Sequence, residues 1–151
     1  MAKSIAIEAG SSPGAIADTQ LKKVERALSV TFPAGFLEFL RASNGGVPVR
    51  KFFLLAGNEK VVERFLSIIA DYKTNPLGMY DIEVTWSQIE DRLTAELIPF
   101  AALFAGDFLC FDFSVKPPAV MLWNHDYSSE DSPDLTPVAR SFEAFCAMLH
   151  D

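Results

Sequence analysis

The sequence predicts a single α+β domain with a central, mostly antiparallel sheet flanked by helices at both chain ends. Helical spacing of apolar residues is concentrated at 18–46 and 141–150, whereas strand-like runs bounded by turn residues lie mainly between them. A chain of 151 residues also has the size of one ordinary domain. Because helices and strands are segregated along the chain, an α+β fold is favoured over a regular βαβ alternation.

The N-terminal part of the chain is predicted to be a loosely held lead-in, residues 1–16, followed by a domain over residues 17–151. The lead-in is weakly patterned, and "GSSPG" has the composition of a loop. "LKKVERAL" then has helical spacing, with Asp18 or Thr19 available as N-cap. "VTFP" should break this helix, and Pro33 is placed to begin a second helix that stops at the glycines of "SNGG".

The middle of the chain is predicted to hold the first strands and a further helix. "VRKFFLLAG" (residues 49–57) is apolar and bounded by Pro and Gly, as strands are. In "NEKVVERFLSIIADY" (58–72) the apolar residues fit the period of an amphipathic helix capped by Asn58. Residues 80–93 are ambiguous, since "DIEV" alternates like a strand and "WSQIEDRL" favours a helix. "ELIPFAALF" (96–104) is another strand-like run.

The stretch "DFLCFDFSVKPPAVMLWNHD" predicts an antiparallel hairpin, because two strand-like runs flank a link of five residues. Alternation places Leu109 and Phe111 on one face and Cys110 and Asp112 on the other. "DYSSEDSPD" is expected to be a polar acidic loop. The chain should close with an amphipathic helix over "SFEAFCAMLH", with Ser141 as its N-cap.

The hairpin contains residue types that also occur in active sites, so catalysis has to be considered. A nucleophilic Cys needs a base within reach and surroundings that lower its pKa. Cys110 instead lies mid-strand between apolar residues, with carboxylates nearby, and the hairpin register brings His125 toward Asp107 rather than Cys110. Cys110 and Cys146 are therefore interpreted as small core residues, and Asp112 as an acceptor for backbone N–H groups at the hairpin turn.

Known ligand and cofactor motifs are absent. The sequence contains no HExxH, CxxC, GxGxxG, P-loop or GxSxG pattern. We therefore expect no catalytic residue, no metal site and no cofactor. A hydrolase using Cys110, Asp112 and His125 is the least favoured of the alternatives.

The charge is unevenly distributed along the chain. Residues 1–75 carry ten Lys/Arg and seven Asp/Glu (net +3), and residues 76–151 carry three Lys/Arg and thirteen Asp/Glu (net −10). The acidic half argues against nucleic acid as a partner and suits a basic protein, although solubility alone would also explain it. No signal peptide or membrane-spanning run is evident. We expect a cytoplasmic protein with reduced thiols and no membrane association.

Five motifs in fixed order resemble the SUKH superfamily, which includes the SMI/KNR-type yeast cell-wall-synthesis regulator and many bacterial immunity proteins. The motifs lie within residues 17–149 and are "LKKVERALSVTFPAGFLEFLRASNGG", "LIPFA", "GDFLCFDF", "VMLWNHD" and "VARSFEAFCAML". The resemblance implies a compact α+β domain that binds proteins and has no known catalytic residues. Bacterial members look like antidotes to secreted toxins, often nucleases, whereas other members are regulators of cellular partners.

These inferences predict a non-catalytic immunity protein that neutralises a basic toxin such as a nuclease. A regulatory or scaffold protein that binds an endogenous partner is the alternative, and a monomer or weak homodimer is expected. An aromatic anchor ringed by acids suits a basic surface. The expected partner-binding residues lie at the second hairpin strand and the acidic loop: Trp123, His125, Asp126, Tyr127, Glu130, Asp131 and Asp134. Core packing remains the alternative for Trp123, and a solvated loop is the alternative for the acids.

Overall fold

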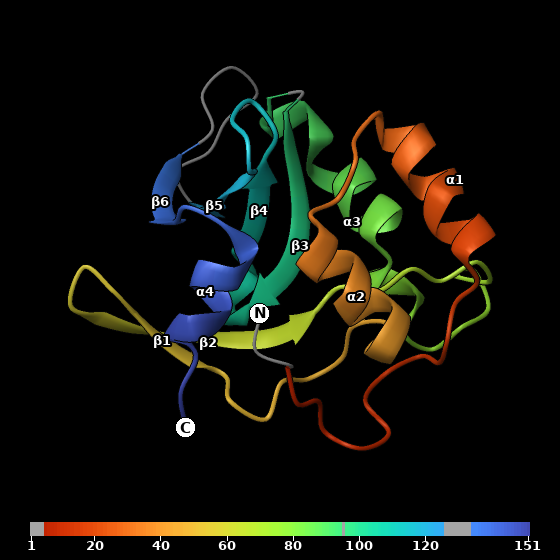
Figure 1. The fold of residues 1–151 in the computed structure, drawn as a ribbon, viewed down its shortest axis with the longest axis horizontal. Helices are drawn as coiled ribbons and strands as arrows, with labels where there is room; N and C mark the ends of the chain where they lie inside the picture. The colour runs from red at the N-terminus through yellow and green to blue at the C-terminus, as the bar shows by residue number, and fades with distance from the viewer. Residues whose placement is uncertain (1–4, 95, 126–133) are drawn as a thin grey trace.

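A computed structural model of the chain describes residues 5–94, 96–125 and 134–151 and confirms the α+β class (Figure 1). Its sheet has six strands in the order β1-β2-β3-β4-β5-β6, each antiparallel to the next. In chain order, the elements are α1 (Asp18–Leu28), α2 (Ala34–Ser43), β1 (Phe52–Leu55), β2 (Asn58–Phe65), η1 (Gly78–Tyr80), α3 (Ile82–Ile89), η2 (Glu90–Arg92), β3 (Leu97–Leu103), η3 (Phe104–Gly106), β4 (Phe108–Asp112), β5 (Ala119–Trp123), β6 (Leu135–Ala139) and α4 (Phe142–Met148).

The main core lies between the sheet and helices α2 and α4, which cross its front face in Figure 1. Phenylalanine rings fill this space. Phe100 of β3 and Phe111 of β4 stack with ring centroids 4.1 Å apart, and Phe36 of α2 and Phe142 of α4 pack edge-on against them. Each such ring removes a large apolar area from water, so burial of this cluster stabilises the fold.

A second, smaller cluster occupies the opposite face of the sheet. It contains Ile89 of α3, Leu97, Cys110 and Trp123. Neighbouring side chains of a strand point to opposite faces, so Leu109 and Phe111 enter the main core while Cys110 enters the small one. The alternation expected for this hairpin is confirmed.

The helix ends follow local chemistry in most places. Asn44 takes a left-handed conformation (φ 49°) at the end of α2, and the Ser141 hydroxyl accepts the Ala144 N–H at 3.1 Å, as predicted for α4. The predicted cap of α1 is wrong. Ala17 occupies that position without a side-chain hydrogen bond, while the Asp18 carboxylate pairs with Arg41 at 2.9 Å.

The ambiguous segment near residue 80 is helical. The Asp81 side chain accepts the Val84 N–H at 3.1 Å and so begins α3, which is followed by the short helix η2. The hydrogen bond from Val84 to Asp81 stabilises the first turn of a helix, and this effect outweighs the strand-like alternation of "DIEV".

The helix predicted over residues 58–72, with Asn58 as its cap, is wrong. Asn58–Phe65 form strand β2, which pairs with β1 through a tight turn and continues alongside β3. Ala56 (φ 52°) and Gly57 (φ 82°) both have positive φ, which is the geometry of the two-residue turns that match the twist of a hairpin. Pairing on both sides therefore outweighs the helical spacing of the apolar residues.

The sequence also gave no indication of β6. This strand closes the sheet beside β5 and contains Pro137, which lies opposite Met121. Proline has no N–H to donate to a neighbouring strand, so it is tolerated at the edge of a sheet. Because proline is rare in strands, its presence argued against a strand in this segment.

The N-terminal lead-in is held more firmly than expected. The Glu8 N–H donates to the Val47 carbonyl at 2.8 Å, and the Val49 N–H donates to the Ala6 carbonyl at 2.9 Å. These bonds join residues 6–8 to the segment just before β1. The proposed domain boundary at residue 17 stays a prediction.

Candidate functional site

The candidate surface lies at the end of the sheet where the β3–β4 turn meets the end of β5. The β4–β5 register places Phe108 opposite Trp123, and Asp107, one residue outside this pair, contacts His125, two residues outside it on the other strand. The same Asp107 oxygen lies 2.7 Å from His125 Nδ1 and accepts the His125 backbone N–H at 3.0 Å. His125 is the last described residue before the segment expected to be an acidic loop, so this contact fixes the chain immediately before that segment.

Arg92 of η2 completes this arrangement. Its Nη2 donates to the His125 carbonyl at 2.5 Å, and its guanidinium lies 4.8 Å from the centre of the Trp123 ring. The indole Nε1 in turn donates to the Arg92 carbonyl at 3.2 Å. We call Arg92, Asp107, Trp123 and His125 the loop base, because together they join η2, the β3–β4 turn and the end of β5.

Trp123 is not the exposed aromatic anchor that the sequence suggested. Its side chain is 1% exposed and belongs to the small cluster with Ile89, Leu97 and Cys110. Strand alternation directs it to the face where α3 contributes Ile89, so core packing, the alternative considered for it, is the correct interpretation. The indole nevertheless supports the candidate surface indirectly through its contacts with Arg92.

The other expected site residues divide into two groups. The His125 side chain is 36% exposed, and Asp134 is partly exposed just before β6; the Asn124 N–H donates to the Asp134 carbonyl at 3.0 Å. These two ends of the acidic loop are thus brought together by the β5–β6 pairing. Asp126, Tyr127, Glu130 and Asp131 lie outside the described residues.

Three residues beside the loop base were not predicted from the sequence. Phe104 is 59% exposed in η3, three residues before Asp107, and Glu90 and Asp91 are exposed in η2, next to Arg92. An aromatic residue directly before the turn residues "AGD" was the only sequence signal for Phe104. Nothing in the sequence places η2 against His125. We call Glu90, Asp91 and Asp134, together with Asp126, Glu130 and Asp131 of the sequence prediction, which lie outside the described residues, the acidic set.

Comparison with known proteins agrees with this architecture. The family model described as SMI1 / KNR4 family (SUKH-1) matches residues 15–148. The chain belongs to the SMI1/KNR4 family. It is also 23% identical over 168 residues to the SPbeta prophage-derived uncharacterized protein YokK of Bacillus subtilis (strain 168), a match that covers 99% of this chain and 82% of that protein. The resemblance inferred from the five motifs is therefore confirmed.

Neither thiol of this SUKH-1 chain is placed for nucleophilic catalysis. Cys110 is fully buried, and burial raises the pKa of its thiol far above the ordinary value. The register puts His125 four residues beyond the level of Cys110, or roughly 13 Å at ~3.3 Å per residue. Burial, and to a lesser extent the charge of Glu143, raises the pKa of Cys146 to about 12, so this thiol is protonated at neutral pH.

Asp112 of the hairpin has the expected structural role, which is to accept hydrogen bonds at the turn. The Asp112 carboxylate accepts the Ser114 N–H at 2.9 Å and the Ser114 hydroxyl at 2.6 Å, and so closes the turn after β4. Among the described residues, no group of three or more His, Cys, Asp or Glu side chains is placed to hold a metal ion. Over the same residues, no helix combines the length and apolar character needed to cross a bilayer.

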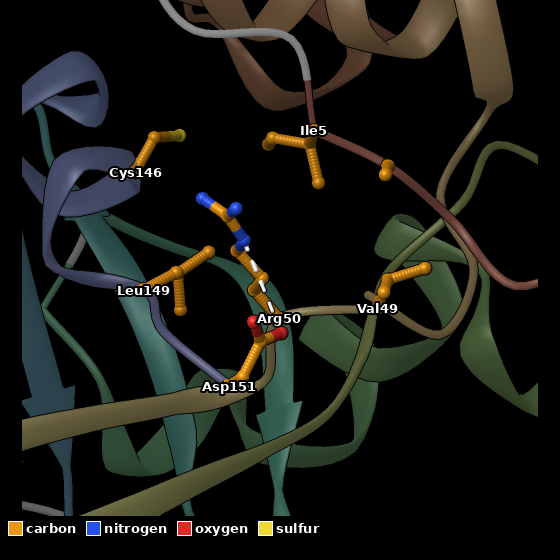
Figure 2. A pocket seen from close by; sticks show the side chains of 7 residues that line it. Ile5, Val49, Arg50, Cys146, Leu149 and Asp151 are labelled. Carbon is orange, nitrogen blue, oxygen red and sulfur yellow. Dashed lines mark ion pairs between the residues drawn. The ribbon is translucent and has the colours of Figure 1, made fainter.

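The SUKH-1 chain also has a pocket of about 450 Å³ near β1, shown in Figure 2. It lies between the N-terminal segment and the residues that follow α4. Those residues are held in place because His150 forms a two-bond bridge with Phe52 at the start of β1. The residues around the pocket are Ile5, Ala6, Val49, Arg50, Cys146, Leu149 and Asp151.

Proposed function

We propose that this SUKH-1 protein is a non-catalytic immunity protein that binds and neutralises a basic toxin domain, such as a nuclease, in the cytoplasm. The observation that carries the proposal is the loop base. It holds His125 near η2 at one end of the sheet, where Asp134 bonds to Asn124 and Phe104 is exposed, and His125 and Asp134 flank the acidic segment 126–133. Family membership supports a binding role, because bacterial SUKH proteins resemble antidotes.

The composition of this surface suits a cationic protein. The acidic set provides a negative field that accelerates the encounter with a basic surface, and the effect weakens as salt screens it. Phe104 offers an apolar contact at the same end of the molecule, which is the role first expected of Trp123. His125 is held by Asp107 and Arg92, so its partly exposed ring is presented in a defined position.

The partner can be identified by capture. The tagged protein is used to retain binding proteins from its native host, and the captured chain is identified by mass spectrometry. A secreted toxin domain whose activity is suppressed on binding supports the immunity role. Capture of a housekeeping protein instead would favour the regulatory role and contradict this proposal.

The acidic surface is then tested by charge reversal. Changing Glu130, Asp131 and Asp134 to Lys should slow association with the captured basic domain by about tenfold at low salt, and by much less at high salt. Stopped-flow fluorescence at several ionic strengths measures the effect. The matched control reverses three exposed acids elsewhere, Glu38, Glu59 and Asp71, with the same change in net charge. Equal association rates for the two triple variants would contradict the role of the acidic surface.

A further inference from the structure

The pocket beside β1 joins three parts of the chain that are distant in sequence. Residues 5–6 of the N-terminal segment form one wall, residues 49–50 form the floor, and the end of α4 with the following residues forms the other wall (Figure 2). Backbone bonds fix the flanking segments, since Val49 bonds to Ala6 and Phe52 bonds to His150. The walls of the pocket are therefore held in place by backbone hydrogen bonds between segments distant in sequence. Its volume lies within the range of small-molecule sites.

Arg50 provides the cationic group of the pocket. Its Nε lies 3.9 Å from Asp151 Oδ1, and the two side chains are 55% and 79% exposed, so this pair is weak. Within the described part of the chain, the Arg50 side chain makes no hydrogen bond. Figure 2 shows its outer nitrogens directed between Ile5 and Cys146, away from Asp151. A planar group with several unused donors thus faces the pocket interior.

The remaining walls are mostly apolar. Ile5 and Leu149 lie on opposite sides, and Val49, 48% exposed, adds a further aliphatic surface. Cys146 contributes a protonated thiol, which behaves as a small apolar group. The pocket therefore combines a guanidinium suited to a carboxylate with aliphatic walls suited to a hydrocarbon chain.

We propose that this pocket binds a small amphipathic carboxylate, with the carboxylate on the outer nitrogens of Arg50 and the aliphatic part against Ile5, Val49 and Leu149. This site is independent of the proposed toxin-binding surface, which lies at the end of β5. Because the pocket exists only in the folded chain, binding should also raise the thermal stability of the protein by mass action.

Decanoate is a suitable probe. Isothermal titration calorimetry should detect its binding to the full chain, and amide shifts in NMR spectra should map to Ala6, Val49 and Leu149. Arg50→Gln should weaken decanoate binding by about tenfold or more, because a charged hydrogen-bonding partner is lost. Asp151→Asn should strengthen binding by about two- to fivefold, because it removes the carboxylate that competes for Arg50.

Two controls separate this site from nonspecific association. Arg140→Gln makes the same substitution at an exposed position and should leave decanoate affinity unchanged. Decanol, which has no charge, should bind Arg50→Gln and the unaltered protein equally. The proposal is overturned if decanoate does not bind, if Arg50→Gln binds it as well as the unaltered protein does, or if the shifted amides lie elsewhere.

Discussion

Asp81 illustrates, at the scale of single residues, how one buried carboxylate organises the backbone around it. One of its oxygens accepts the Ile69 N–H at 2.7 Å, and the other accepts the Val84 N–H at 3.1 Å. The side chain therefore begins α3 and also fixes the loop after β2. Burial raises the pKa of Asp81 above its ordinary value of 3.8, and the backbone N–H groups offset part of this effect.

The raised pKa of Asp81 predicts a specific pH dependence. The folded chain keeps this proton to a higher pH than the unfolded chain, so the contribution of Asp81 to stability falls as pH rises from about 3.8 through the folded pKa. The pKa of Glu83 is also raised, by burial and by the charge of Asp81, which gives an effect of the same sign. Asp81→Asn removes the titrating group at the cost of one backbone hydrogen bond.

Urea unfolding of both proteins between pH 3 and 7 measures this effect. The stability of Asp81→Asn relative to the unaltered chain should increase as pH rises through the window and then level off. The control is Asp18→Asn, which changes an exposed acid in α1. A difference between Asp81→Asn and the unaltered protein that is constant over the whole range would contradict this account.

Elements are joined in this fold by a buried arginine. Arg64 of β2 is only 6% exposed, its Nη2 donates to the Ser11 carbonyl at 2.6 Å, and its guanidinium lies 4.4 Å from the centre of the Tyr80 ring. Burial lowers its pKa, against the opposing effects of Tyr80 and Glu63. One side chain thus connects β2, the N-terminal segment and η1.

Arg64→Ala should loosen the N-terminal segment. We expect a loss of about 2–4 kcal/mol of unfolding free energy, since a charge-assisted hydrogen bond and a cation–π contact disappear. Amide hydrogen exchange at Glu8 and Val49 should accelerate more than exchange in β4. Arg41→Ala, which breaks an exposed ion pair with Asp18, should cost less than about 1 kcal/mol and leave this exchange unchanged. Unaltered exchange in Arg64→Ala would show that other contacts hold the segment.

At the scale of the whole molecule, both edge strands of the sheet are protected against pairing with another chain. β1 is bridged by His150, and β6 carries Pro137, which has no N–H for pairing with another strand. The large apolar side chains exposed within the described ranges lie on separate segments and do not form one element face; they are Val49, Leu54, Tyr72, Met79, Phe104 and Val115. With a net charge of −7, the chain also repels copies of itself.

These features predict a monomer at low micromolar concentration. Light scattering coupled to size-exclusion chromatography should give the mass of a single chain, 16.6 kDa, at both low and high salt. Pro137→Val restores an N–H and a β-forming side chain at the edge, so this variant should self-associate more readily. A dimer mass for the unaltered protein under these conditions would contradict the prediction.

The central hairpin, the end of α2 and the cap of α4 could be predicted from local sequence. The family could be predicted from the order of its motifs. Alternation along β4 assigned Leu109 and Cys110 to opposite faces, and the turn role of Asp112 followed from its position at the hairpin turn. These features depend on residues close together in the chain. For that reason they could be predicted without knowledge of the rest of the fold.

Tertiary structure decided the identity of β2 and the composition of the candidate surface. The apolar spacing of residues 58–65 fits a helix and a strand, and only pairing with β1 and β3 selects the strand. Trp123 enters the core because α3 contributes apolar residues to that face, and η2 lies beside His125 because Arg92 bonds to its carbonyl. The hydrogen bonds of Arg92 with His125 and with Trp123 join residues 33 and 31 positions apart, so no local pattern of the sequence encodes them.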